Sequence, residues 1–366
     1  MYKETRPSQS EFVPVRGLDY HVRVWNQAPT VAATATAMPE ASHGTTNSAQ
    51  VTEPRTSLPN QPGPQNRLSR AAGAAAPSGG SKPREAGSVG VTLFLHGWMD
   101  VAASYQFMVD AFSDAFAAGR TLIAPDWRGF GLTGLSPDGR YGADSYWFAD
   151  YLADLDALLD HYAPGQAVDL VGHSMGGNVA MLYAGVRPGR IRRLVNLEGF
   201  GLPASRPSQA PGQLAQWMDG LKTLQHGEMA LKSYADAGGV AQRLMKTNPR
   251  LTPDKAQWLA AHWARPDASG QWRILGNPAH KLPSAQLYRV DEVLEVHRRI
   301  SSPLLAVEAA GDSMGQWWKG KYSLAEYHER LGQVPDARIA VIQDAGHMLH
   351  HDQPEALARL IEEFLA

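Results

Sequence analysis

The chain contains no cysteine among its 366 residues, which excludes disulfides, a thiol nucleophile and thiolate metal sites. No apolar run approaches the roughly 18 residues that suggest a membrane span. Residues 1–6 are not followed by the apolar segment of a secretory signal. A formal net charge of −2 comes with no basic stripe that would favour nucleic acid or an anionic membrane. We therefore expect a cytoplasmic protein without a membrane span or a nucleic-acid partner.

Large apolar residues are nearly missing from residues 28–88. Ala, Pro, Ser, Thr, Gly, Gln and Asn dominate this stretch. Such a segment buries too little apolar surface to offset the entropy of ordering it. We expect a disordered, low-complexity insertion, and the alternative is a proline-rich segment that binds a partner.

The rest of the chain alternates between short apolar runs and amphipathic segments. Residues 11–15 and 18–25 flank Arg16-Gly17 and are expected to pair as an antiparallel hairpin. Further apolar runs are expected to form strands at residues 90–95, 121–124, 168–171, 193–197, 303–308 and 337–342. Helical segments separate them, which indicates an α/β fold with a mostly parallel sheet covered on both faces.

This alternation stops between residues 201 and 300. Amphipathic pieces broken by prolines predict a helical lid inserted into the α/β core. The core then comprises residues 1–27, which form the hairpin, together with residues 89–200 and 301–366.

The centre of the pattern is Val168–Gly177, in which an apolar strand leads into Gly172-His173-Ser174-Met175-Gly176 and then into a helix. This G-x-S-x-G sequence is typical of a nucleophile elbow. A serine that stands clear of a sheet needs a tight and strained turn, and the two glycines remove side chains that would collide there.

Four motifs in this order resemble the α/β-hydrolase superfamily, in its lid-bearing, lipase- and esterase-like branch. They are His96-Gly97-Trp98, Asp126-Trp127-Arg128-Gly129-Phe130-Gly131, Gly172–Gly177, and Gly346-His347 followed by Pro354-Glu355. The resemblance covers nearly the whole chain except residues 28–88. It implies an α/β-hydrolase fold with the chain order nucleophile, acid, histidine.

The resemblance also implies roles for individual residues. Ser174 is the expected nucleophile, His347 its base, and Asp312 the acid that supports the imidazolium. Glu198 is the alternative acid, and Glu308 ranks third. Members of the family usually follow the acid with a short apolar segment and a proline, whereas Ser313-Met314-Gly315 follows Asp312 here.

The remaining expectations concern the surroundings of the serine. The backbone N–H groups of Trp98 and Met175 are the expected oxyanion donors. The loop 126–131 is expected to be structural. The lid is expected to bring three tryptophans to the mouth of an apolar pocket, namely Trp217, Trp258 and Trp263.

No metal site and no cofactor are expected. His350 and His351, at the start of the last helical region, are expected to be structural.

The leading function is hydrolysis of a carboxylic ester of a small or medium apolar substrate through an acyl-serine intermediate. The alternatives are a C–C, lactone or peracid reaction of the same triad, and a non-catalytic binding relative. The oligomeric state is left open.

Overall fold

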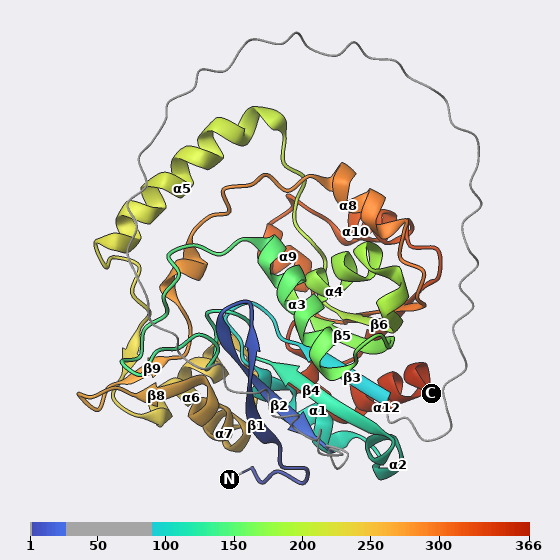
Figure 1. Ribbon diagram of the computed structural model, residues 1–366, viewed down its shortest axis with the longest axis horizontal. Coiled ribbons are helices and arrows are strands. Elements are labelled where there is room, and N and C mark those ends of the chain that lie inside the picture. Colours follow the sequence, from blue (N-terminus) through green and yellow to red (C-terminus); the bar gives the residue numbers. More distant parts are fainter. Residues whose placement is uncertain (1, 27–89) are drawn as a thin grey trace, which may run out of the picture. The chain divides into compact units, whose positions relative to one another are not determined.

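The structure of the chain, a computed structural model, describes residues 2–26 and 90–366 (Figure 1). The insertion expected at residues 28–88 lies outside these described residues. Eight strands form one sheet in the order β1-β2-β4-β3-β5-β6-β10-β11. Their bounds are Gln9–Val15, Leu18–Trp25, Arg120–Pro125, Gly90–Leu95, Val168–His173, Ile191–Leu197, Leu304–Ala309 and Ala337–Ile342, in that spatial order.

The N-terminal hairpin is the antiparallel part of this sheet. Strand β1 pairs with β2, and β2 pairs antiparallel with β4, whereas the pairs from β4 to β11 are parallel. Val15 lies opposite Leu18, so Arg16 and Gly17 alone form the turn. Both have positive φ angles, 48° and 81°. Paired positive φ values match the right-handed twist of the flanking strands, which explains why glycine stands at the second position.

Helices cover both faces of the sheet (Figure 1). Helices α3 (Phe148–Tyr162), α4 (Met175–Val186) and α10 (Leu324–Leu331) pack on one face, with α8 (Val290–His297) against α4, and α1 (Gln106–Ala111), α2 (Asp114–Ala118) and α12 (Pro354–Leu365) pack on the other. The helical segment between β3 and β4 is divided into the short helices η1 (Ala102–Tyr105), α1 and α2. The division falls where Phe112 is extended and the Ser113 side chain caps α2 by accepting from the Phe116 N–H.

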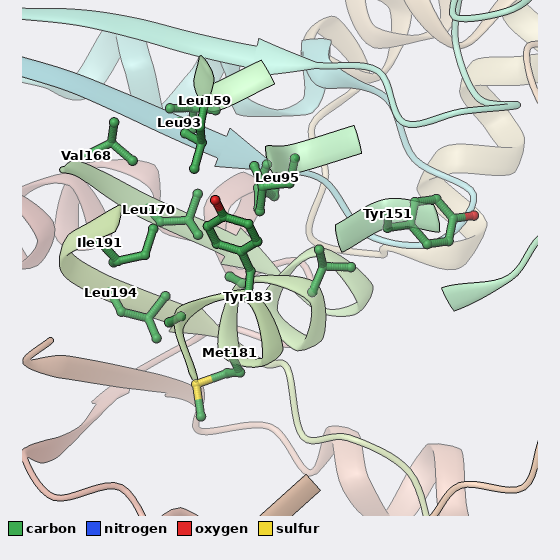
Figure 2. Close-up of a cluster of buried hydrophobic side chains, with 14 of the residues drawn as sticks. Leu93, Leu95, Tyr151, Leu159, Val168, Leu170, Met181, Tyr183, Ile191 and Leu194 are labelled. Atoms are coloured by element: carbon green, nitrogen blue, oxygen red, sulfur yellow. The ribbon is translucent and has the colours of Figure 1, made fainter. Parts of the chain in front are cut away.

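Side chains on the strands alternate between two cores. Leu93 and Leu95 of β3 enter the core beneath α3 and α4, whereas Phe94 between them enters the core beneath α1 and α12. Leu170, Leu194 and Tyr183 belong to the first of these cores (Figure 2). Because successive strand side chains point to opposite faces, strands with almost no polar residue are required when both faces are covered.

Residues 201–300, the inserted segment, connect β6 to β10. They contain helices and also a small sheet of order β7-β9-β8 that the sequence pattern did not predict. Their elements are η3 (Pro207–Gln209), α5 (Ala210–Gln225), β7 (Ser233–Tyr234), α6 (Ala237–Thr247), α7 (Pro253–Trp263), β8 (Ala264–Pro266), β9 (Trp272–Ile274), η4 (Pro278–Lys281) and α8. Helix α8 packs against α4 of the core, where Gly185 leaves room for the backbone of Val296.

Length and hydropathy of the helices bear on membrane insertion. Within residues 2–26 and 90–366, every helix is too short or too polar to cross a bilayer.

Candidate active site

Ser174 stands in a tight turn between β5, which ends at His173, and α4, which begins at Met175. Its φ of 52° and ψ of −116° are rare for a residue with a side chain. The glycines on either side are required by space. A Cβ on Gly172 would lie 2.4 Å from the Gly176 carbonyl oxygen, and one on Gly176 would lie 2.0 Å from the Leu95 carbonyl oxygen. The G-x-S-x-G sequence therefore forms the expected elbow.

His347 contacts the serine directly. Its Nε2 lies 3.0 Å from Ser174 Oγ, which is hydrogen-bonding distance. The histidine follows β11, and its backbone is held by His173, whose Nε2–H donates to the His347 carbonyl oxygen over 2.7 Å. The two residues expected to act as nucleophile and base therefore lie within hydrogen-bonding distance, and the ring of His173 bonds to the backbone of His347.

Glu198 makes the contact with His347 that was expected of Asp312. The Glu198 carboxylate lies with Oε2 3.2 Å from His347 Nδ1, and its side chain is 1% exposed. Its Oε1 accepts the Ala309 N–H over 2.7 Å. Glu198 follows β6 directly and has a φ of 55°. One buried carboxylate is thus fixed between the histidine ring and the end of β10.

Asp312 lies at the start of the short helix α9 (Ser313–Trp318). Its Oδ1 accepts the Gly315 N–H over 2.7 Å, which is a helix-capping bond. In this structure the Asp312 carboxylate is bonded to the N-terminus of α9, and Glu198, the alternative acid, makes the contact with His347. The sequence carried a sign of this in Ser313-Met314-Gly315, where a family member would have an apolar segment and a proline.

Glu308, the third candidate acid, is also occupied elsewhere. Its carboxylate lies 2.6 Å from His328 Nε2 of α10, and its side chain is 7% exposed. Glu198, Glu308 and Asp312 nevertheless line one cavity of about 210 Å³ behind the histidine.

The loop after β3 lies against the serine. A Cβ on Gly97 would be 3.2 Å from Ser174 Cβ, so the loop approaches this closely only because residue 97 is glycine. The buried His96 fixes the loop, because its Nδ1–H donates to the Gly97 carbonyl oxygen over 2.8 Å and its Nε2 accepts the Trp127 N–H over 2.9 Å. Burial lowers the pKa of His96 to about 4, which is consistent with a neutral ring that accepts at Nε2.

Asp126 in the loop 126–131 has the structural role that was expected. Its carboxylate is buried and accepts from His21 Nδ1 at 2.7 Å, from the Ala102 N–H at 2.7 Å and from the Leu132 N–H at 3.0 Å. Burial alone would raise the pKa of Asp126, but the hydrogen bond and charge of His21 lower it to about 2. Asp126 thereby ties strand β2 to the loops beside the serine.

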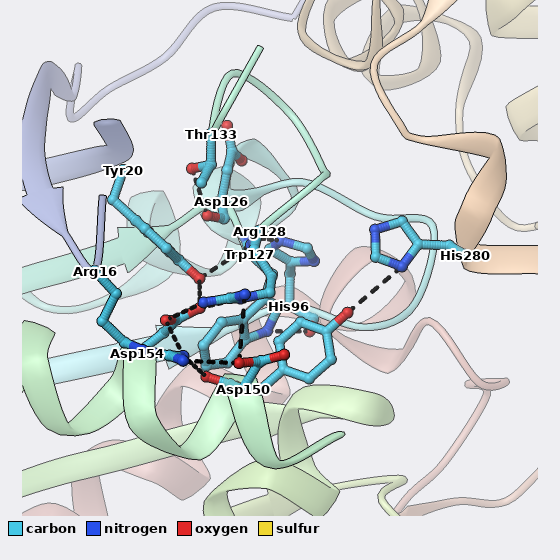
Figure 3. A network of polar contacts seen from close by, with 11 residues as sticks. Arg16, Tyr20, His96, Asp126, Trp127, Arg128, Thr133, Asp150, Asp154 and His280 are labelled. Atoms are coloured by element: carbon cyan, nitrogen blue, oxygen red, sulfur yellow. Dashed lines mark hydrogen bonds and ion pairs between the residues drawn. The ribbon is translucent and has the colours of Figure 1, made fainter. Parts of the chain in front are cut away.

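Arg128 of the same loop anchors it to α3. The arginine contacts the fully buried Asp154 at 2.5 and 2.6 Å, and Asp154 also accepts from Tyr20 and Arg16 of the hairpin (Figure 3). This network joins the hairpin, the loop and the helix, and none of these hydrogen bonds involves Ser174.

The three tryptophans expected at a pocket mouth are held by other contacts. Trp258 donates to Glu4 and packs on Tyr2 and Phe107. Trp263 donates to Asp100. Trp217 donates to Ser145 and packs on the ring of Trp147.

Trp317 of α9 lies beside the site instead. Its ring centroid is 5.5 Å from that of His347, and the residue is 57% exposed. Trp98, which follows Gly97, is 47% exposed and donates from its indole to the His280 carbonyl oxygen of the inserted segment. Sequence reasoning missed Trp317 because the signal is only an aromatic pair in a short helix after β10.

Comparisons with known proteins agree with this fold. The sequence model of the alpha/beta hydrolase fold matches residues 91–354. The cis-3-alkyl-4-alkyloxetan-2-one decarboxylase of Shewanella oneidensis is 34% identical over 278 residues, which are 75% of this chain and 81% of that protein. The 2-(acetamidomethylene)succinate hydrolase of Mesorhizobium japonicum is 26% identical over 282 residues, 77% of this chain and 90% of that protein.

Solved structures show the same architecture. The thioesterase domain from the curacin biosynthetic pathway superposes with a TM-score of 0.65 at 20% identity, and the match covers 97% of this chain and 99% of that one. At this identity the likeness concerns the fold. Together with the sequence match over most of the chain, it shows that the protein belongs to the alpha/beta hydrolase fold family.

Proposed function

We propose that the protein is a serine hydrolase that cleaves a carboxylic ester through an acyl-serine intermediate. In this proposal Ser174 is the nucleophile, His347 the general base and acid, and Glu198 the acid of the triad. The observation that carries it is the chain of contacts Ser174 Oγ to His347 Nε2 at 3.0 Å and His347 Nδ1 to Glu198 Oε2 at 3.2 Å. Serine is a weak nucleophile at neutral pH, and a base within hydrogen-bonding distance activates it.

The chemistry follows from these contacts. Ser174 Oγ attacks the ester carbonyl while His347 Nε2 accepts its proton, and the imidazolium then gives that proton to the departing alkoxide. Water deprotonated by His347 attacks the acyl-serine, which releases the carboxylic acid and restores the hydroxyl. The buried Glu198 carboxylate accepts from Nδ1–H, so it holds the tautomer that leaves Nε2 free to accept.

The developing oxyanion needs preorganised donors. We assign the Met175 N–H, at the first residue of α4, and the Trp98 N–H to this role. Supporting this assignment, α4 starts directly after Ser174, and the Gly97 backbone lies against the serine side chain. His96 keeps that loop in place through its bonds to Gly97 and Trp127.

The walls of the site favour an apolar acyl group of small or medium size. Trp98 and Trp317 expose much of their surface; Trp98 follows Gly97, which lies against Ser174, and Trp317 packs beside His347. The inserted segment reaches this region through the bond from Trp98 to His280. We therefore keep the role of a lid for residues 201–300, with Trp98 and Trp317 in place of the three tryptophans first expected.

A two-part experiment tests the function. The wild-type protein should label with a fluorophosphonate probe and hydrolyse p-nitrophenyl esters. Ser174→Ala should abolish labelling and lower kcat by roughly 10⁴-fold or more, with an unchanged circular-dichroism spectrum. Labelling of the variant at the wild-type rate would refute Ser174 as nucleophile.

The panel should extend beyond simple esters, because the relatives carry names for different bonds. They include a diacylglycerol lipase of Mus musculus and a 2-hydroxymuconate semialdehyde hydrolase of Pseudomonas putida. Esters of increasing acyl length should be compared with lactones and with C–C substrates. Highest kcat/KM on an apolar ester supports the proposal, and highest kcat/KM on a lactone or a C–C bond contradicts it.

A further inference from the structure

Three buried polar side chains meet on the side of the elbow that faces away from Ser174. They are Asp100, His173 and His350, which are 3%, 2% and 0% exposed. Each comes from a segment that carries part of the site. Asp100 lies two residues after Trp98, His173 directly precedes Ser174, and His350 lies three residues after His347.

Each of these three side chains has at least one polar atom without a hydrogen-bond partner. One ligand atom from each side chain lies within 4.8 Å of those of the other two. Asp100 Oδ2, His173 Nδ1 and both ring nitrogens of His350 are buried without a partner. A buried polar atom left unpaired costs about 1–3 kcal/mol, so unpaired atoms on all three side chains of one cluster point to an occupant.

The neighbouring bonds decide what kind of occupant fits. His173 Nε2 must carry its proton, because its partner is the His347 carbonyl oxygen, and this leaves a lone pair on Nδ1. Asp100 is oriented through its other oxygen, which accepts from the Val101 N–H, the Trp263 indole and the Ser104 hydroxyl. Its Oδ2 is an unpaired acceptor, as is His173 Nδ1, and a cation held between the two side chains would satisfy both.

A shared proton is the competing occupant. Burial raises the pKa of Asp100 to about 7, so a protonated carboxyl could donate to His173 Nδ1. That bond would satisfy two of the four atoms and would leave both nitrogens of His350 unpaired.

We propose that Asp100, His173 and His350 bind one divalent transition-metal ion of the Zn²⁺ class. Two imidazoles and one carboxylate are a common donor set for such ions, at about 2.0–2.2 Å per bond, with water as a further ligand. Four-coordinate geometry places ligand atoms roughly 3.4 Å apart, so ligand atoms that now lie within 4.8 Å of one another would approach by up to about 1.4 Å on binding.

The consequence of binding is structural. One ion would join the loop after β3, the nucleophile elbow and the loop after β11, which carry the proposed oxyanion donor, nucleophile and base. Metal on His173 Nδ1 would also strengthen the bond that Nε2–H donates to the His347 carbonyl. The inference does not depend on the proposed function, because Ser174 takes no part in the cluster.

Metal binding can be measured on the full chain, purified without an oligohistidine tag and stripped with a chelator. We expect one Co²⁺ per chain, with the intense visible absorption of four-coordinate cobalt, and its displacement by Zn²⁺. Zn²⁺ at about 100 times its dissociation constant should raise Tm by about 4 °C. Absence of stoichiometric Co²⁺ and of a Tm shift would overturn the proposal and favour the shared proton.

Two matched variants test the ligands. His350→Phe keeps a ring for stacking on Tyr105 but removes both nitrogens, and it should abolish the Co²⁺ spectrum and the Tm shift. His351→Phe removes the adjacent buried histidine, which lies outside the cluster, and should retain both. Should His350→Phe fail to fold, Asp100→Asn keeps the volume and should weaken Co²⁺ binding at least about 10-fold. Equal binding by wild type and either ligand variant would refute the site.

The Ser174→Ala protein separates this inference from the proposed function. It should bind Co²⁺ with the wild-type stoichiometry even though it is inactive. Loss of the Co²⁺ spectrum in Ser174→Ala would contradict the assignment of the ligands.

Discussion

The neighbouring strands β6 and β10 each lead to a carboxylate, and the two carboxylates differ in burial and in hydrogen-bond partners. Glu198 follows β6 directly, is 3% exposed, and lies between the His347 ring and the Ala309 N–H. Asp312 comes three residues after β10, is exposed, and caps α9. The electrostatic interaction between two groups is strong only where water is excluded. The buried Glu198 carboxylate can therefore stabilise a positive charge on His347, whereas the exposed Asp312 carboxylate acts only as a helix cap.

The largest expected effect distinguishes these two carboxylates directly. Glu198→Gln should lower kcat by roughly 10²- to 10⁴-fold with little change in KM, because the neutral amide no longer supports the imidazolium and allows the wrong tautomer. Steady-state kinetics on a p-nitrophenyl ester measure this, with circular dichroism as the check on folding.

Two controls accompany this variant. Asp312→Asn should keep kcat within about threefold, since an asparagine still caps a helix. Glu308→Gln, which removes the partner of His328 in the same cavity, should also stay within about threefold. If Asp312→Asn loses most of its kcat and Glu198→Gln keeps it, Asp312 is the acid of the triad and the assignment of Glu198 is wrong.

A smaller effect is expected from Trp317 of helix α9, which follows β10. Trp317→Ala should lower kcat/KM about 10-fold for medium apolar esters, because about 1–2 kcal/mol of apolar contact beside His347 is lost. Acetyl esters should change much less. Trp147→Ala is the matched control, because that tryptophan is also exposed but packs on Trp217. Equal losses in the two variants would show that Trp317 does not contact the acyl group.

The smallest effect concerns stability. Asp312→Ala removes the cap of α9 and should lower the free energy of unfolding by about 1 kcal/mol, or Tm by roughly 2 °C. Asp312→Asn should leave Tm unchanged. Thermal unfolding of both variants measures the difference, and a Tm for Asp312→Ala equal to that of wild type would show that the cap carries no stability.

The sequence predicted those elements whose residue pattern is local. The elbow was predictable because Gly172 and Gly176 are demanded by space around Ser174, and the hairpin because Arg16-Gly17 fits a two-residue turn. Strands β3, β4, β5, β6, β10 and β11 were visible as apolar runs, because both faces of the large sheet are covered.

The acid of the site and the partners of the tryptophans could not be predicted, because they depend on contacts between segments that are far apart in the sequence. Glu198 and Asp312 both follow strands whose ends meet at one sheet edge, and the choice between them depends on a positive φ at Glu198 and a capped turn at Asp312. The tryptophans of the inserted segment could be assigned to a helical region, but not to partners such as Glu4, which lies 254 positions away from Trp258.

His96 has a further consequence, for proton linkage between folding and acidity. Its folded-state pKa of about 4 lies below the pKa of roughly 6.5 that histidine has in an unfolded chain. Between pH 6.5 and pH 4 the unfolded state therefore binds a proton at His96 that the folded state does not. The stability that His96 contributes is complete above pH 6.5 and falls with acidification toward pH 4, by up to about 1.4 kcal/mol per pH unit. A protonated ring could no longer accept the Trp127 N–H, so protonation of His96 would loosen the loop beside Ser174.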